Sequence, residues 1–230
     1  MDMFSALIAS FRQIAETGGP VVVVLMGVAV LTLTVAIYKV WQFWRSAVGR
    51  HKALTEAVEA WDRGDKPAAR EALGRSKSYL APVIKMAMVS NGTRSGAGAE
   101  RLQAEAETRF AKLETGFRLL DSVAQLAPLL GLFGTVLGMI EAFRSLQAAG
   151  SQVDPSILAG GIWVALLTTA VGLVVAMPTA LILSWLEQRM EAERVIADKA
   201  ILTVLTPSND VPAPAAAASA PTPEMVAAHG

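Results

Sequence analysis

Three threonines are the residues of greatest chemical interest in this sequence, because they lie inside long uncharged segments. Thr135 is the single hydroxyl-bearing residue among residues 126–140, and Thr168 and Thr169 are adjacent within the uncharged run 155–186. A hydroxyl on an apolar helix either bonds a carbonyl of its own helix or gives an ion path a polar wall. Both alternatives stay open for Thr135. Adjacent helical positions differ by about 100°, so one of Thr168 and Thr169 packs or bonds back while the other lines a cavity.

The residues offer little support for other kinds of chemistry. The sequence contains no nucleophile elbow, no phosphate-binding glycine loop and no paired carboxylates inside an apolar segment. Asp121 and Glu141 flank the segment around Thr135, as interfacial anchors do. With no cysteine and two histidines, we expect no metal and no cofactor. We therefore do not expect an enzyme, and the balance of 20 basic and 20 acidic residues gives no reason to expect a nucleic acid partner.

Three uncharged stretches carry these hydroxyls, and each is long enough to cross a bilayer. They run from Pro20 to Tyr38, from Ser122 to Ile140 and from Pro155 to Leu186. A helix needs about 20 such residues to span the hydrocarbon. With 53% hydrophobic and 17% charged residues, the chain is also too apolar for an ordinary soluble domain. We predict an all-α polytopic membrane protein, with three transmembrane helices extended into a cytoplasmic helical domain.

The distribution of lysine and arginine sets the orientation. Fifteen of the 20 basic residues lie between Lys39 and Arg118, and three more follow Leu186. By the positive-inside rule, the N-terminus is outside, and the long loop and C-terminus are inside.

The periodicity predicts helices that continue beyond the bilayer on the inner side. We expect the first span to continue as a helix toward Trp61, and the third to continue to residue 205. From Ala99, a coiled-coil type of seam enters the second span, and we expect one unbroken helix there. The seam consists of Leu102, Ala106, Phe110, Leu113, Phe117 and Leu120.

Local signals complete the expected organisation. Gly64 ends one helix, Asp65 caps the next, and Pro67 falls in its first turn. The first helix is amphipathic and lies either on the membrane or against a neighbouring subunit. The predicted segments are 1–18 (periplasmic amphipathic helix), 19–41 (first transmembrane helix), 42–118 (cytoplasmic helical domain), 119–141 (second transmembrane helix), 142–154 (periplasmic loop), 155–186 (third transmembrane helix), 187–206 (cytoplasmic helix) and 207–230 (disordered Pro/Ala tail).

Small residues and prolines mark the second and third spans as helices that pack closely on others. Gly134 and Gly138 form a small-xxx-small pair, and Pro128 frees a carbonyl that a neighbour or water must satisfy. The candidate packing residues are Pro128, Gly131, Gly134, Gly138, Gly172 and Pro178.

Two stretches, "APLLGLFGTVLGMIEAF" and "GIWVALLTTAVGLVVAMP", strongly resemble the signature segments of the MotA/TolQ/ExbB proton channel family, and ExbB most of all. The resemblance covers the three spans and the large first loop, leaving out the tail. It implies a multi-pass protein of the bacterial inner membrane that forms a homopentamer. It also implies two partners, which are an ExbD-like single-span protein with an intramembrane aspartate and a TonB-like protein. The family's pore threonines correspond to Thr135 and Thr169.

One residue departs from the family pattern. ExbB and TolQ commonly carry a glutamate five residues before the third-span threonine, where this chain has Val164. We expect Val164 to face the same cavity as Thr169, so that a glutamate there is tolerated. Its absence leaves the spans without a titratable group, and the ion-carrying carboxylate must come from another chain. The alternatives are a TolQ-like subunit for envelope maintenance and a scaffold that has lost ion coupling.

Overall fold

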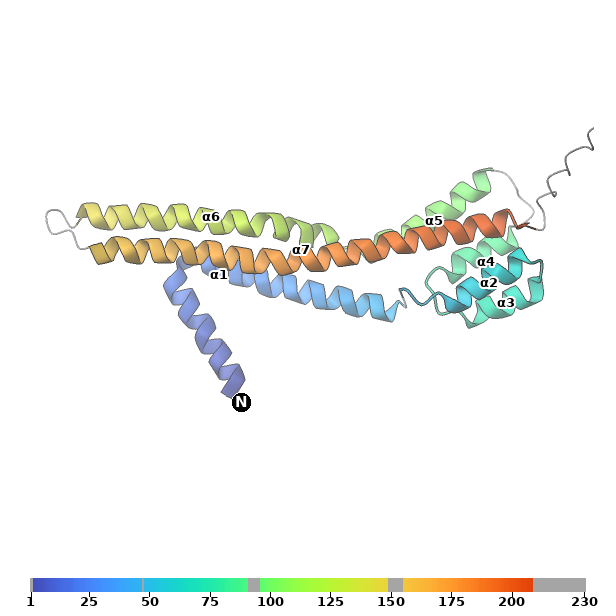
Figure 1. Ribbon diagram of the computed structural model, residues 1–230, viewed down its shortest axis with the longest axis horizontal. Coiled ribbons are helices and arrows are strands. Elements are labelled where there is room, and N and C mark those ends of the chain that lie inside the picture. Colours follow the sequence, from blue (N-terminus) through green and yellow to red (C-terminus); the bar gives the residue numbers. More distant parts are fainter. Residues whose placement is uncertain (1, 47, 91–95, 149–154, 209–230) are drawn as a thin grey trace, which may run out of the picture. The chain divides into compact units, whose positions relative to one another are not determined.

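The computed structural model describes the backbone of residues 2–46, 48–90, 96–148 and 155–208, and the side chains of these residues except 2–17 and 96–97. Within these ranges all regular elements longer than one turn are α-helices (Figure 1). The predictions for the side chains of the N-terminal helix, for loop residues 149–154 and for tail residues 209–230 lie outside this description. The helices are α1 (Asp2–Arg45), α2 (Lys52–Asp62), α3 (Lys66–Arg75), α4 (Ala81–Val89), α5 (Gly96–Glu114), α6 (Phe117–Ala148) and α7 (Pro155–Leu205).

Three helices have the length and apolar composition of membrane spans. They are Gly18–Arg45 within α1, then α6, and finally α7. The predicted fold class, an all-α protein with three candidate spans, is confirmed. At about 1.5 Å per residue, the 51 residues of α7 extend over about 77 Å, well beyond the thickness of a bilayer.

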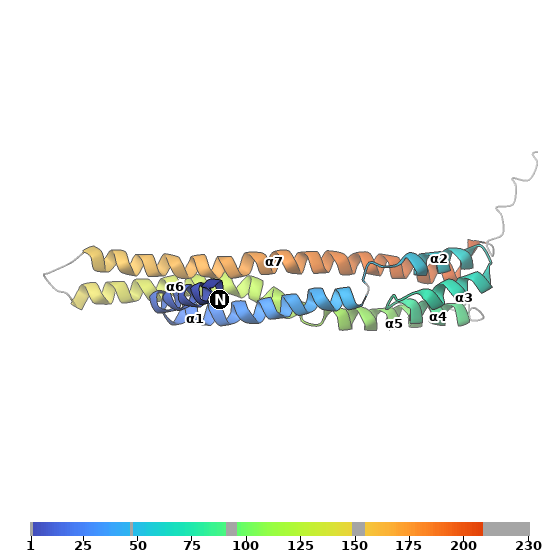
Figure 2. The ribbon, with the colours of Figure 1, turned by 90° about the horizontal axis from the view of Figure 1, so that it is seen from below.

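The chain divides into two compact units. Unit 1 consists of Met1–Ser46 and Phe110–Glu193, and unit 2 consists of Ala47–Arg109 and Arg194–Gly230. In unit 1, α6 and α7 run side by side as an antiparallel hairpin in both views (Figures 1 and 2). The part of α1 that follows its bend at Gly19 packs against this hairpin. Their shared core is formed by Leu25, Val123, Ala127 and Ala176.

The first span ends earlier than the periodicity predicts. The expected helix toward Trp61 is wrong, because α1 ends at Arg45 and α2 begins only at Lys52. Between them, Gly49 has a φ of 83°, a left-handed conformation that a helix cannot contain. At its other end, α1 bends at Gly19, where the backbone leaves helical geometry.

The expected unbroken helix through the seam is also wrong. The structure ends α5 at Glu114 and begins α6 at Phe117, and Gly116 between them has a φ of 95°. A single glycine within a helical pattern is a weak signal, because helices tolerate glycine at a modest cost. The hydrophobic pattern itself is retained, since all six seam residues, from Leu102 to Leu120, are buried.

Unit 2 is a group of short helices held to the C-terminal part of α7. The predicted start of α3 is confirmed, because Asp65 Oδ1 accepts a hydrogen bond from the Ala68 amide at 3.1 Å. Trp61 is buried, and its Nε1 donates to the carbonyl of Val204 in the last turn of α7 at 3.1 Å. The amide of Ser208 donates to Asp62 Oδ1 at 2.7 Å. Tryptophan and aspartate thus fasten α2 to the end of α7.

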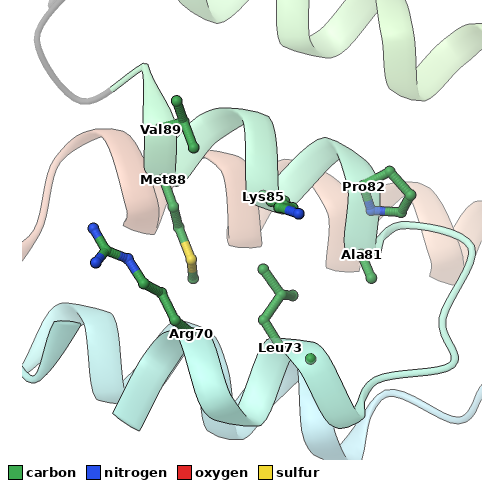
Figure 3. A pocket seen from close by; sticks show the side chains of 8 residues that line it. Arg70, Leu73, Ala81, Pro82, Lys85, Met88 and Val89 are labelled. Carbon is green, nitrogen blue, oxygen red and sulfur yellow. The ribbon is translucent and has the colours of Figure 1, made fainter. Parts of the chain in front are cut away.

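A shallow groove of about 610 Å³ lies between α3 and α4 (Figure 3). Its walls are apolar, and Arg70 and Lys85 are the charged residues of its lining. The remaining lining residues are Leu73, Gly74, Ala81, Pro82, Met88 and Val89.

Candidate functional site

The α6–α7 hairpin packs through backbone and very small side chains. A Cβ atom added to Gly172 would lie 2.6 Å from the carbonyl oxygen of Ala127, which leaves no room for it. One added to Gly131 would lie 2.9 Å from the carbonyl oxygen of Thr168. We call this contact the glycine seam, and its facing pairs are Gly131 with Gly172, Gly134 with Thr168, Gly138 with Ala165 and Ala142 with Gly161.

Thr168 lies within the glycine seam. Its side chain is buried, and its Oγ1 lies 2.7 Å from the carbonyl oxygen of Ala165 and 3.2 Å from that of Gly131. The hydroxyl proton therefore serves both its own helix and α6. Of the two adjacent threonines, Thr168 is the one that packs and bonds back.

The hydroxyl of Thr135 bonds to its own helix, which is one of the two alternatives that the sequence leaves open. Its hydroxyl donates to the carbonyl of Leu132 at 2.7 Å, one turn earlier in α6. The side chain is half-buried. Because a hydroxyl oxygen also has two lone pairs, this bond leaves Thr135 able to accept a hydrogen bond from water or from a protonated group.

Thr169 has a polar atom that the described residues do not satisfy. Its Oγ1 is buried and has no hydrogen-bond partner among them. An unsatisfied buried hydroxyl costs roughly 1–3 kcal/mol, so native structures rarely keep one without another partner. The described residues therefore leave this hydrogen bond unmade.

The register of the seam brings Thr135 and Thr169 to one side of the hairpin. Each follows directly after a member of the contact pair Gly134–Thr168. In two antiparallel right-handed helices, the residues that follow a facing pair turn toward the same side. The two hydroxyls therefore lie at the same level and on the same side, which we call the threonine flank. Pro128, seven residues before Thr135, is on this side as well.

Helix α1 covers the opposite side of the hairpin. Leu130, Val171 and Val175 pack there against a core that includes Leu25 of α1. We call this side the α1 flank. The threonine flank thus has no helix of unit 1 packed on it in the part that the structure describes.

Val164 does not share the threonine flank. Positions five apart on a helix differ by about 140°, and Val164 precedes Val171 by seven residues, which places it on the α1 flank. This differs from the expectation that residue 164 faces the same cavity as Thr169.

The prolines have different surroundings. Pro128 is half-buried inside α6, close to the seam, whereas Pro178 is exposed inside α7. Each removes one backbone donor from its helix.

Comparison with known proteins identifies the family. Residues 72–198 match the model of the MotA/TolQ/ExbB proton channel family. The chain belongs to this family. The matched region contains α6, most of α7 and therefore all four pairs of the glycine seam.

Individual relatives of this family carry ExbB and TolQ names. The chain is 34% identical over 169 residues to an ExbB-like biopolymer transport protein of Synechocystis, covering 69% of this chain and 63% of that one. It is 28% identical over 202 residues to the biopolymer transport protein ExbB of Neisseria meningitidis serogroup A, covering 78% and 88%. It is 40% identical over 80 residues to the Tol-Pal system protein TolQ of Haemophilus influenzae, covering 35% of each chain.

Sequence reasoning missed one buried charge, which lies in the first span and away from the threonines. Lys39 follows the first apolar run directly and resembles an ordinary interfacial lysine, yet the structure buries it in unit 1. A signal was present in the sequence, because aromatic residues surround this lysine at positions 38, 41, 43 and 44. They indicate a site where a cation meets aromatic rings.

Proposed function

We propose that this chain is an ExbB-like subunit of an inner-membrane complex driven by the proton-motive force, which energises transport across the outer membrane. In this proposal, identical subunits, five by family resemblance, form a ring with their threonine flanks toward a central pore. An ExbD-like protein occupies the pore with its intramembrane aspartate, and a TonB-like protein receives the motion. The N-terminus is periplasmic and the C-terminus cytoplasmic.

The observation that carries this proposal is the buried hydroxyl of Thr169, which has no hydrogen-bond partner among the described residues and lies on the same flank as Thr135. The uncharged run 155–186 and the run from Ser122 to Ile140 supply no carboxylate of their own. In this proposal a rotation of the Thr169 side chain brings its hydroxyl to a partner's carboxylate in the pore, which supplies the hydrogen bond that the described residues do not. The hydroxyls would in turn stabilise the ionised form of that carboxylate in a site with little water.

The test is proton uptake by liposomes that contain the chain together with its ExbD-like partner. Thr169→Val keeps shape and removes the hydroxyl, and we expect uptake to fall about tenfold, as a penalty of about 1.4 kcal/mol predicts. Thr135→Val should have a similar effect. Thr169→Ser restores the hydroxyl and should restore uptake.

Thr34→Val is the matched control, because the exposed Thr34 hydroxyl donates to the Val30 carbonyl of its own helix at 2.8 Å. It should behave as the wild type. Native mass spectrometry should show a pentamer for every variant. Full uptake by Thr135→Val and Thr169→Val would remove the pore-lining role, and a stable monomeric wild type would remove the ring.

A scaffold without ion coupling is the second candidate, favoured by Val164 in place of the family glutamate. It predicts no proton uptake by the wild-type complex at any pH gradient. The similarity to TolQ also supports an alternative role for the same mechanism, which is maintenance of the cell envelope. Cells that lack this chain separate the two roles. Loss of growth on a substrate that needs energised uptake indicates the transport role, and increased sensitivity to detergents indicates the envelope role.

A further inference from the structure

Lys39 is a buried cation in the first span. Only 3% of its surface is exposed. Among the residues whose side chains the structure describes, no carboxylate pairs with its ammonium group. Burying a charge without a counter-ion is costly, so the groups around Lys39 must offset much of that cost.

Its neighbours come from three helices. Nζ donates to Gln42 Oε1 of α1 at 2.7 Å and to the carbonyl oxygen of Leu113 in α5 at 3.1 Å. Nζ also lies 5.9 Å from the ring centroid of Phe117 in α6 and 5.8 Å from that of Tyr38. A cation over aromatic rings is favourable, most of all where water is excluded. One side chain therefore joins α1, α5 and α6.

The contact lies at the break between α5 and α6. Because α5 ends at Glu114, the carbonyl of Leu113 is one of those that the helix itself leaves without a donor. Lys39 provides that donor, and a cation is favoured at a helix C-terminus by the helix dipole. A Cβ atom on Gly116 would lie 3.3 Å from Lys39 Cε, so the left-handed glycine and the lysine fit together.

The break lies at the N-terminal end of α6, the helix that carries Thr135. From Phe117, the first residue of α6, to Thr135 is 18 residues, or about 27 Å along one helix. A change of direction at the break would therefore displace the threonine flank. Two residues, Thr115 and Gly116, separate the two helices, and the left-handed backbone of Gly116 lets the chain change direction there.

We propose that Lys39 is a positioning residue for ion coupling, which locks the α5–α6 break and so fixes the placement of Thr135. The coupling part of this inference rests on the proposed function. The locking part concerns only contacts within unit 1.

Lys39→Met tests the lock, because methionine has a similar length and keeps the packing but cannot donate to Leu113. Hydrogen exchange of the full complex in lipid nanodiscs should become about tenfold faster for the first bonded amides of α6, beginning with Leu120, as loss of a charge-assisted hydrogen bond predicts. Proton uptake should fall by a similar factor. Lys39→Arg, which keeps a cationic donor, should restore both.

Gln42→Met is the matched control, because it removes an acceptor of Nζ on α1 and leaves the contact to Leu113 in place. It should change the exchange of α6 by less than twofold. Native mass spectrometry checks that each variant assembles as the wild type does.

The outcomes separate the two proposals. Unchanged exchange at Leu120 in Lys39→Met overturns the lock, and faster exchange with unchanged proton uptake overturns the role in coupling. If the wild type takes up no protons, the proposed function and the coupling role both fail, and exchange still decides whether Lys39 holds the break. Faster exchange with lower uptake, both restored by arginine, supports the full inference.

Discussion

The glycine seam of unit 1 and the core of unit 2 hold their helices together by different means. In the seam, Gly131 and Gly172 let two backbones touch, and Thr168 is the largest side chain at the contact. Unit 2 instead buries large apolar side chains, among them Trp61, Leu54, Leu80, Ile84 and Ile201.

The difference follows from the surroundings of each region. Between membrane helices, lipid tails are as apolar as leucine, so burying a large side chain gains little and close packing decides. The helices α2, α3 and α4 have 9–11 residues and cannot span a bilayer, so their apolar faces gain from leaving water. We therefore expect that truncating a buried side chain destabilises unit 2, and that enlarging a side chain destabilises the glycine seam.

Truncation in unit 2 should have the largest effect. Trp61→Ala leaves a cavity and removes the hydrogen bond to Val204, and should destabilise unit 2 by about 3–5 kcal/mol. Hydrogen exchange of the purified full-length protein should show this as faster exchange in α2 and in residues 194–205. Trp61→Phe keeps most of the burial and should cost clearly less. Equal effects of both variants would mean that the hydrogen bond, and not burial, holds this region.

Enlargement in the seam should come next. Gly172→Ala forces a methyl group against the carbonyl of Ala127, and overpacking of this kind costs about 1–3 kcal/mol. Gly160→Ala is the matched control, because, its own stretch of helix aside, nothing in the structure lies within 4 Å of the added Cβ. Unfolding in detergent mixtures, followed by circular dichroism, measures both. A Gly172→Ala variant as stable as Gly160→Ala would contradict backbone contact at the seam.

Removal of the hydrogen bond across the seam should have the smallest effect. Thr168→Val keeps shape and loses the contact to Gly131, and hydrogen bonds between membrane helices average about 0.6 kcal/mol. The same unfolding measurement applies. We expect proton uptake by this variant to stay within about twofold of the wild type. An uptake loss as large as that of Thr169→Val would place Thr168 in the ion path after all.

Much of the architecture could be predicted from the sequence, because long-range contacts are not needed to define a membrane span. Uncharged length alone identified the three spans, since each must exceed the thickness of the hydrocarbon. The start of α3 was readable from Asp65 and Pro67, because capping acts within four residues. The two helix breaks were not readable, since Gly49 and Gly116 differ from a tolerated helical glycine only in backbone conformation.

The sequence by itself determined that Thr168 and Thr169 face different surfaces, because adjacent positions on a helix always differ by about 100°. Only the tertiary structure decided which threonine packs in the seam and which has a hydroxyl without a partner among the described residues. That choice depends on the register of α6 against α7, which is set by where two backbones can touch. The same reason applies to Lys39, whose role depends on Leu113, 74 residues away in the chain.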